Sequence, residues 1–228
     1  MTDAQRCVLC SDCIAECPVG AREIIGQQRT VAQVMAEIRK DVIFYDQSGG
    51  GVTFSGGEPL MQPEFLLALL NQCRSEDIHT AVDTTCYAQA ELVRRVAEVA
   101  NLLLCDIKHM DSGRHERHTG VRNELILDNI RMLAEAGRRM LIRIPIVPGF
   151  NEDPENIAST AQFVRSLRTV GRIDILPYNR GGLEKSVRLT AQTQDFASLL
   201  RADPPDSDTM EEIAGALREH GFEVKIGG

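Results

Sequence analysis

Residues 79–108 read HTAVDTTCYAQAELVRRVAEVANLLLCDIK, and this stretch decides the predicted fold. It starts with a short apolar strand pattern, continues as an amphipathic helix over residues 89–100, and ends in the buried-strand pattern of residues 101–108. Two strands joined by a helix pair in parallel, because the helix carries the chain back across the sheet. The stretch therefore predicts a strand–helix–strand unit of a parallel sheet.

The same alternation extends along the chain in both directions. The strand patterns are apolar and alternate only weakly, which is typical of strands covered on both faces. We predict an α/β fold, a complete or partial parallel β/α barrel, with a doubly wound open sheet as the structural alternative. The expected strands are residues 51–57, 79–85, 101–108, 138–149, 172–179 and 222–228, and the expected helices are residues 30–41, 63–78, 89–100, 123–137, 154–171 and 207–221.

The composition limits the possible partners. The 228-residue chain carries a formal charge of -8 and has an isoelectric point of about 5.2. Nucleic acids and anionic membranes bind clustered Lys and Arg, so we expect neither as a partner. No apolar run approaches the roughly 20 residues that span a bilayer, and the first residues lack a secretory signal pattern. We therefore expect a soluble cytoplasmic protein.

The cysteines indicate a metal cluster. Residues 7–18 read CVLCSDCIAECP, with the ligand spacing of a bacterial ferredoxin. Zinc sites usually separate their cysteine pairs by a long spacer, so an iron–sulfur cluster is favoured over zinc. Cys73 and Cys105 lie in apolar patterns and are expected to be buried, inert thiols. The predicted cluster ligands are Cys7, Cys10, Cys13 and Cys17.

Polar residues stand at the carboxyl end of five expected strands, where parallel α/β folds bind ligands. The segments are SGGEP (55–59), DTT (83–85), DIKHMD (106–111), Arg143 before a Pro-Gly pair, and LPYN (176–179). Glycine carbonyls and carboxylates accept from an ammonium, whereas Lys108 and Arg143 are donors suited to a carboxylate. An amino acid head group satisfies both sets.

Each segment also has a purely structural interpretation. The glycines of SGGEP could form a tight turn, and Asp83 with Thr84 could cap a helix. Asp106 and Lys108 could form a local ion pair of little energetic value, and Asn179 could be a turn residue. Arg143 is harder to explain in this way, because a buried guanidinium needs a partner. A zinc site is disfavoured for the three nearby histidines, which lack helical i, i+4 spacing: His109, His115 and His118.

The order of these motifs resembles a known family. GGGVTFSGGEPL, DTT, DIKHMD, IRIPIVPGFN, LPYN and FEVKIGG follow one another along essentially the whole chain. This series resembles the glycyl-radical enzyme activating enzymes of the radical S-adenosylmethionine (SAM) superfamily, typified by the pyruvate formate-lyase activating enzyme. The resemblance implies a partial β/α barrel that binds SAM across its strand ends.

The resemblance also implies a chemistry and its partners. In the family, a reduced [4Fe–4S] cluster cleaves SAM to methionine and a 5′-deoxyadenosyl radical, which abstracts hydrogen from a glycine of a partner glycyl-radical enzyme. An electron donor such as flavodoxin or ferredoxin supplies the electron.

Several residues of this chain match positions with a role in the family. Gly56, Gly57 and Glu58 would lie near the methionine amino group of SAM. Lys108 and Arg143 would contact its carboxylate, with Asn179 near the adenosyl part. The family's DLK triplet matches Asp106, Ile107 and Lys108, and a monovalent cation site matches Asp83, Thr84 and Asp106.

The chain also departs from the family pattern. The motif of three cysteines spaced CxxxCxxC is absent from the 228 residues, so we assign no catalytic cysteine and expect no SAM cleavage by this chain alone. We expect an N-terminally truncated protein. Residues 1–27 would be half of a ferredoxin-like module, and residues 28–228 a barrel without its first strand. Cys86 stands where the family usually has glycine, which could restrict the backbone there.

Two other function classes remain open from the sequence. The first is a non-catalytic remnant that binds an iron–sulfur cluster or a partner protein. The second is an ordinary β/α-barrel enzyme with another substrate, which leaves the cysteine run unexplained.

Overall fold

The computed structural model describes residues 8, 10–19, 21, 26–178 and 203–227. Six parallel strands form one sheet, and each strand pairs with the next one in the chain. The strands are β1 (Val52–Phe54), β2 (Thr80–Thr84), β3 (Leu102–Asp106), β4 (Met140–Ile146), β5 (Arg172–Pro177) and β6 (Glu223–Ile226).

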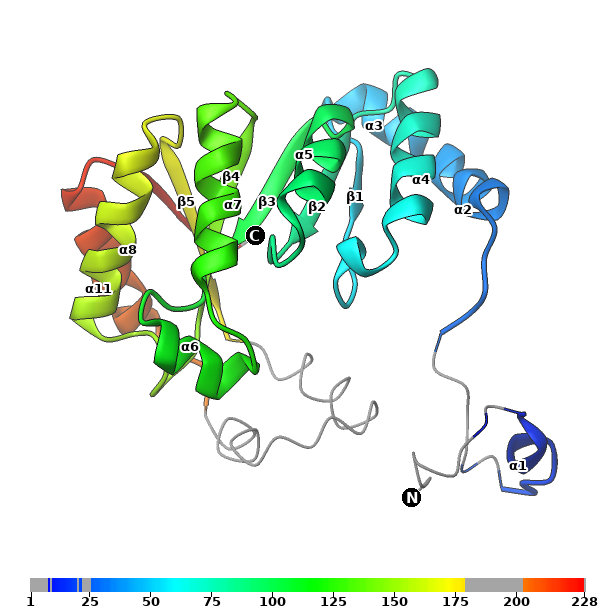
Figure 1. The fold of residues 1–228 in the computed structure, drawn as a ribbon, viewed down its shortest axis with the longest axis horizontal. Helices are drawn as coiled ribbons and strands as arrows, with labels where there is room; N and C mark the ends of the chain where they lie inside the picture. Colours follow the sequence, from blue (N-terminus) through cyan, green and yellow to red (C-terminus); the bar gives the residue numbers. More distant parts are fainter. Residues whose placement is uncertain (1–7, 9, 20, 22–25, 179–202, 228) are drawn as a thin grey trace.

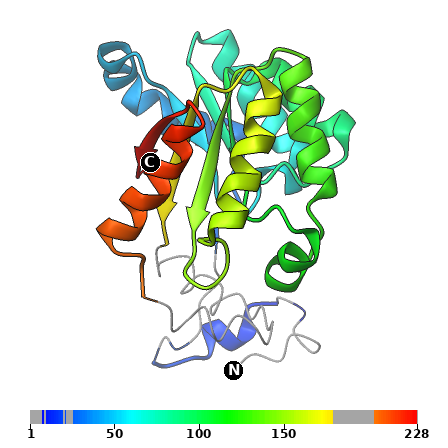
Figure 2. The same cartoon turned by 90° about the vertical axis from the view of Figure 1, so that its left-hand side faces the viewer.

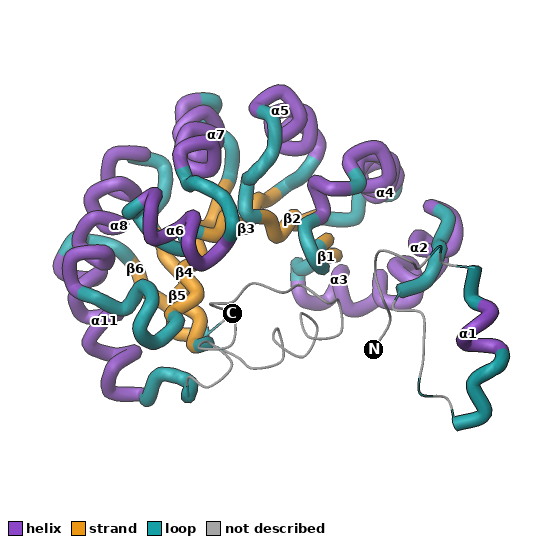
Figure 3. Tube along the Cα trace, turned by 60° about the horizontal axis from the view of Figure 1, so that its bottom comes forward, coloured by secondary structure: helices purple, strands orange, loops and turns teal. Residues whose placement is uncertain are grey.

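The strand order β1-β2-β3-β4-β5-β6 decides between the two predicted architectures. A doubly wound sheet reverses its winding direction and places helices on both faces. Here the winding never reverses among the described strands, and Figure 3 shows the connecting helices outside a curved arc with the strands inside it. The prediction of a partial β/α barrel is therefore confirmed.

Capping side chains fix where the outer helices begin. Asp153 accepts a hydrogen bond from the Asn156 amide at the start of α8 (Pro154–Leu167), and Asp206 accepts one from the Thr209 amide at the start of α11 (Ser207–Glu219). The expected Thr30 cap opens α2 (Val31–Ile38) as a full capping box with Gln33. The helices that cover the sheet are α4 (Pro63–Ser75), α5 (Ala90–Val99), α7 (Glu124–Glu135), α8 (Pro154–Leu167) and α11 (Ser207–Glu219).

Strand alternation separates the core from the concave face. On β4, Ile142 and Ile144 are fully buried in the main hydrophobic cluster, which lies between the sheet and the helices. Because successive side chains point to opposite faces, Arg143 lies on the concave face. The same alternation on β3 buries Cys105 and places Asp106 beside Arg143 in the strand register. Burial also raises the pKa of the Cys73 thiol, as expected for an inert cysteine.

The sequence did not predict several short elements. They are α1 (Asp12–Ala15), α3 (Val42–Ser48), η2 (Pro59–Met61) and α6 (Ser112–Thr119), whereas η1 (Arg39–Asp41) lies within the expected helix over residues 30–41. The segment SGRHERHT has no apolar stripe, yet α6 forms because Asp111 caps its first turn and Gly120 ends it with a φ of 83°. The expected first strand was also too long, because β1 ends before the SGG turn.

The cysteine-containing segment stands apart from the sheet. Helix α1 buries none of its residues. Figures 1 and 2 show it on the side of the molecule toward which the strands point. No helix in the described ranges is long and apolar enough to cross a membrane.

Candidate functional site

Four charged side chains meet at the carboxyl ends of β2, β3 and β4. Arg143 Nη1 lies 2.7 Å from Asp83 Oδ2, and Lys108 Nζ lies 2.9 Å from Asp106 Oδ2. All four are between 19% and 29% exposed, so they remain reachable from the concave face. Asp83 is thus the ionic partner that the partly buried guanidinium of Arg143 requires. Asp106 and Lys108 form the local ion pair that the sequence suggested. We call these four residues the charge cluster.

Burial dominates the electrostatics of Asp83. Desolvation raises its pKa, and the nearby Asp106 raises it further, whereas Arg143 and Lys108 act in the opposite direction. Each cation is thus held by a carboxylate of the same cluster. A ligand that carries both an ammonium and a carboxylate can exchange partners with these pairs without leaving a charge unpaired.

The SGGEP segment forms an open turn above β1. Gly56 has a φ of 136°, which side chains rarely adopt. A Cβ built on Gly56 or Gly57 would meet no atom within 4 Å, so both glycines border free space. This open turn and the charge cluster together offer acceptors and donors that suit an amino acid head group.

Glu58 holds this turn against the next strand. Its carboxylate accepts from the hydroxyls of Thr84 at 2.7 Å and Thr85 at 2.6 Å, and from the Thr85 amide at 2.9 Å. It also accepts from the Leu60 amide at 3.1 Å. The Glu58 carboxylate is therefore occupied within the protein, whereas Gly56 and Gly57 border open space. Thr84 supports Glu58 rather than capping a helix.

Cys86 has a backbone conformation that favours glycine, the residue that the resembled family usually has at this position. Its φ is 58°, in the left-handed region, and its side chain is fully buried. Its amide donates to the Thr84 hydroxyl at 3.0 Å, and its sulfur lies 3.5 Å from that of Cys105. The hydrogen bond with the Cys105 thiol, together with burial, raises the pKa of Cys86, so it is not a reactive thiolate.

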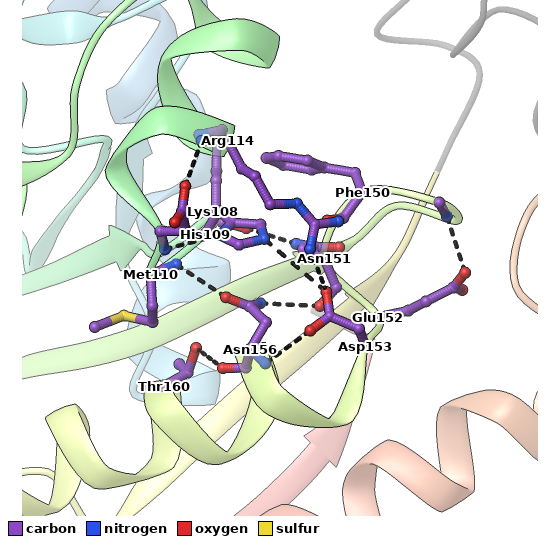
Figure 4. A network of polar contacts seen from close by, with 12 residues as sticks. Lys108, His109, Met110, Arg114, Phe150, Asn151, Glu152, Asp153, Asn156 and Thr160 are labelled. Carbon is purple, nitrogen blue, oxygen red and sulfur yellow. Dashed lines mark hydrogen bonds and ion pairs between the residues drawn. The ribbon is translucent and has the colours of Figure 1, made fainter.

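Three buried asparagines, which sequence reasoning missed, hold the loops at this edge. In each case the side-chain amide donates to two main-chain carbonyls: Asn123 to His109 and Met110, Asn129 to Cys86 and Ala88, and Asn151 to Lys108 and Pro145. Figure 4 shows the part of this network around Asn151. Asn129 had a usable signal, because it falls on the apolar face of a helical pattern.

The histidines after β3 have structural partners. The Asp111 amide donates to His109 Nδ1 at 2.9 Å, and His115 Nδ1 lies 2.7 Å from the Val121 carbonyl. Within the described ranges, no group of three or more His, Cys, Asp or Glu side chains is placed to hold a metal ion.

The structure covers the predicted cluster ligands only in part. Cys10 and Cys13 are exposed, and Cys17 Sγ accepts from the Ala21 amide at 3.3 Å. Cys7 and Asn179 lie outside the described residues. The thiolate donor set suits an iron–sulfur cluster, and the ligand assignment remains a prediction from the spacing.

Comparison with known proteins identifies similar chains. Residues 6–161 match the radical SAM superfamily. The chain is 40% identical, over 91% of its length, to the trans-4-hydroxy-L-proline dehydratase activating enzyme of Clostridioides difficile, and it spans 68% of that protein. It is 36% identical, over 92% of its length, to the choline trimethylamine-lyase activating enzyme of Oleidesulfovibrio alaskensis, and it spans 67% of that protein.

A solved structure agrees with these relatives. A domain of the pyruvate-formate lyase-activating enzyme from Bacteroides vulgatus superposes with a TM-score of 0.65 at 39% identity, and the match covers 78% of this chain and 99% of that domain. The family match over residues 6–161 and the partial β/α barrel show a radical SAM enzyme, a class that uses SAM and a [4Fe–4S] cluster. The chain belongs to the glycyl-radical enzyme activating enzymes of this superfamily, as its motifs predicted.

Proposed function

We propose that this protein takes part in glycyl-radical enzyme activation, the reductive cleavage of SAM coupled to hydrogen abstraction from a glycine of a partner enzyme. The observation that carries the proposal is the charge cluster beside the open glycine turn. An electron donor such as flavodoxin or ferredoxin would reduce the iron–sulfur cluster. A soluble cytoplasmic location fits a chain with clustered thiols, since such thiols persist in a reducing compartment.

The chain's own residues would hold SAM by its amino acid head. The main chain at Gly56 and Gly57 accepts from the methionine ammonium, and Lys108 with Arg143 binds its carboxylate. Ile107 supports this arrangement, because it is buried and its amide donates to the Arg143 carbonyl at 2.9 Å. Glu58 acts indirectly, by fixing the turn. Asn179 is proposed to contact the adenosyl part.

The two acidic residues of the charge cluster have a second proposed role. Asp83 and Asp106, together with Thr84, would hold a monovalent cation next to SAM, since oxygen ligands suit hard cations.

The cysteines would hold iron and sulfur. We propose that residues 1–27 are part of a ferredoxin-like module with ligands Cys7, Cys10, Cys13 and Cys17, and that residues 28–228 form the barrel. These 228 residues contain no CxxxCxxC motif, so the chain alone is expected to bind SAM weakly and not to cleave it.

The test is an anaerobic reconstitution with iron, sulfide, dithionite and SAM. We expect the 228-residue chain to yield no 5′-deoxyadenosine above a no-protein control, and a chain carrying an added N-terminal CxxxCxxC segment from a relative to yield it. 5′-Deoxyadenosine from the 228-residue chain would contradict the expected inactivity. No 5′-deoxyadenosine from either chain would favour the non-catalytic alternative.

A further inference from the structure

We infer that Asn151 is a positioning residue that fixes the main chain of Lys108 at the SAM site. The inference rests on the proposed function and adds a residue that contacts no substrate. Asn151 lies in the turn between β4 and α8, and Lys108 lies just beyond β3. The two are 43 positions apart in the chain and are joined by a direct hydrogen bond.

Asn151 uses its whole side-chain amide. Its Nδ2 donates to the Lys108 carbonyl at 2.8 Å and to the Pro145 carbonyl at 2.7 Å, while its Oδ1 accepts from the Val147 amide at 2.8 Å. The residue is fully buried. Its side chain therefore joins the end of β4 to Lys108 just beyond β3 (Figure 4), and these are two of the three strand ends that carry the charge cluster.

Neighbouring bonds make this connection rigid. The Asn156 side chain donates to the Asn151 carbonyl at 2.9 Å and accepts from the Met110 amide at 2.9 Å. On the other side of Lys108, the Ile107 amide donates to the Arg143 carbonyl at 2.9 Å. The Lys108 main chain is thus held before and after the residue, and its side chain leaves from a fixed point toward Asp106.

The direction of donation makes the inference testable. Asn151→Asp replaces a donor that faces two carbonyls with an acceptor, so two attractive contacts become repulsive. Asn151→Ala removes the donor without adding a charge. The matched control is Asn101→Asp at the opposite ends of the strands, because Asn101 accepts through Oδ1 from the Thr80 amide and hydroxyl, and aspartate keeps both bonds.

The experiment measures binding of SAM and of decarboxylated SAM, which lacks the carboxylate, to the full 228-residue chain by NMR titration. If Asn151 acts through Lys108, its loss weakens carboxylate recognition in particular. We expect the preference for SAM over the decarboxylated form to fall at least about fivefold in both Asn151 variants and to stay within about twofold in the control. An equal loss of affinity for both ligands would overturn the inference and leave Asn151 with a general structural role.

A second measurement needs no ligand. Trypsin cleaves after lysine, and native-state cleavage reports local opening. We expect cleavage between Lys108 and His109 to accelerate at least about tenfold in Asn151→Asp and not in Asn101→Asp. An unchanged rate would overturn the inference. If the wild type shows no preference for the carboxylate, the proposed role of Lys108 and Arg143 is wrong, and cleavage alone decides whether Asn151 holds Lys108.

Discussion

The amino ends and the carboxyl ends of the six strands are built differently. At the amino ends the main chains pack closely, with Gly51 against the His79 carbonyl and the Thr80 amide and hydroxyl bonded to Asn101. At the carboxyl ends Gly56 and Gly57 border open space, and charged side chains remain partly exposed. Glycine thus allows close packing of the main chain at the amino ends and leaves open space at the carboxyl ends.

The largest expected effect comes from Gly51. A Cβ there would lie 1.9 Å from the His79 carbonyl oxygen, and main-chain atoms cannot move aside cheaply. We expect Gly51→Ala to lower the free energy of unfolding by about 3 kcal/mol, at the upper end for overpacking. Urea denaturation followed by circular dichroism measures this. A loss below about 0.5 kcal/mol, the range of ordinary surface substitutions, would show that the amino ends are not tightly packed.

Gly57 is the matched position at the carboxyl ends. A methyl group there meets no protein atom within 4 Å and requires no left-handed backbone. We expect Gly57→Ala to change stability by less than about 0.5 kcal/mol. Its methyl group would occupy ligand space, so SAM affinity should fall at least about tenfold, or ~1.4 kcal/mol. Unchanged affinity with unchanged stability would remove the glycine turn from the proposed site.

We expect acid to destabilise the segment that carries His109 and His115, at the carboxyl ends of the strands. Burial lowers the pKa values of His109 and His115 below the ordinary value of 6.5, with Arg114 adding to the effect at His109. As pH falls below 6.5, the unfolded chain therefore binds protons before the folded chain does, and stability falls by at most about 1.4 kcal/mol per pH unit for each histidine. Hydrogen exchange of the α6 amides measures the loosening. His109→Gln should flatten the pH dependence, and an equally steep curve would contradict the assignment.

The smallest effect distinguishes two substitutions at Cys86. Both Cys86→Gly and Cys86→Ala lose the buried sulfur, but only glycine relieves the left-handed φ of 58°. We expect the glycine variant to be more stable than the alanine variant by about 0.7 kcal/mol. Thermal denaturation compares them directly, and greater stability of the alanine variant would mean that the backbone strain at Cys86 is negligible.

Sequence reasoning predicted the order of the elements better than the contacts between segments that are far apart in the chain. Strand and helix order follow from local apolar periodicity, so the barrel and the segments at its strand ends were predictable. The sequence indicated that Arg143 needs an ionic partner, because a guanidinium in an apolar strand requires one. It did not indicate that this partner is Asp83. The occupation of the Glu58 carboxylate and the role of Asn151 depend on contacts between segments far apart in the chain. Helix α6 depends on capping rather than on an apolar stripe.

The central claim is that SAM binds at the carboxyl ends of the strands by its amino acid head. The most direct measurement is an NMR titration of the 228-residue chain with SAM, followed through its assigned backbone amides. We predict saturable shifts at Gly56, Gly57 and residues 106–108, with the amides of Thr80 and Asn101 at the amino ends unchanged. Shifts concentrated at the amino ends, or no saturable shifts at millimolar SAM, would contradict the account.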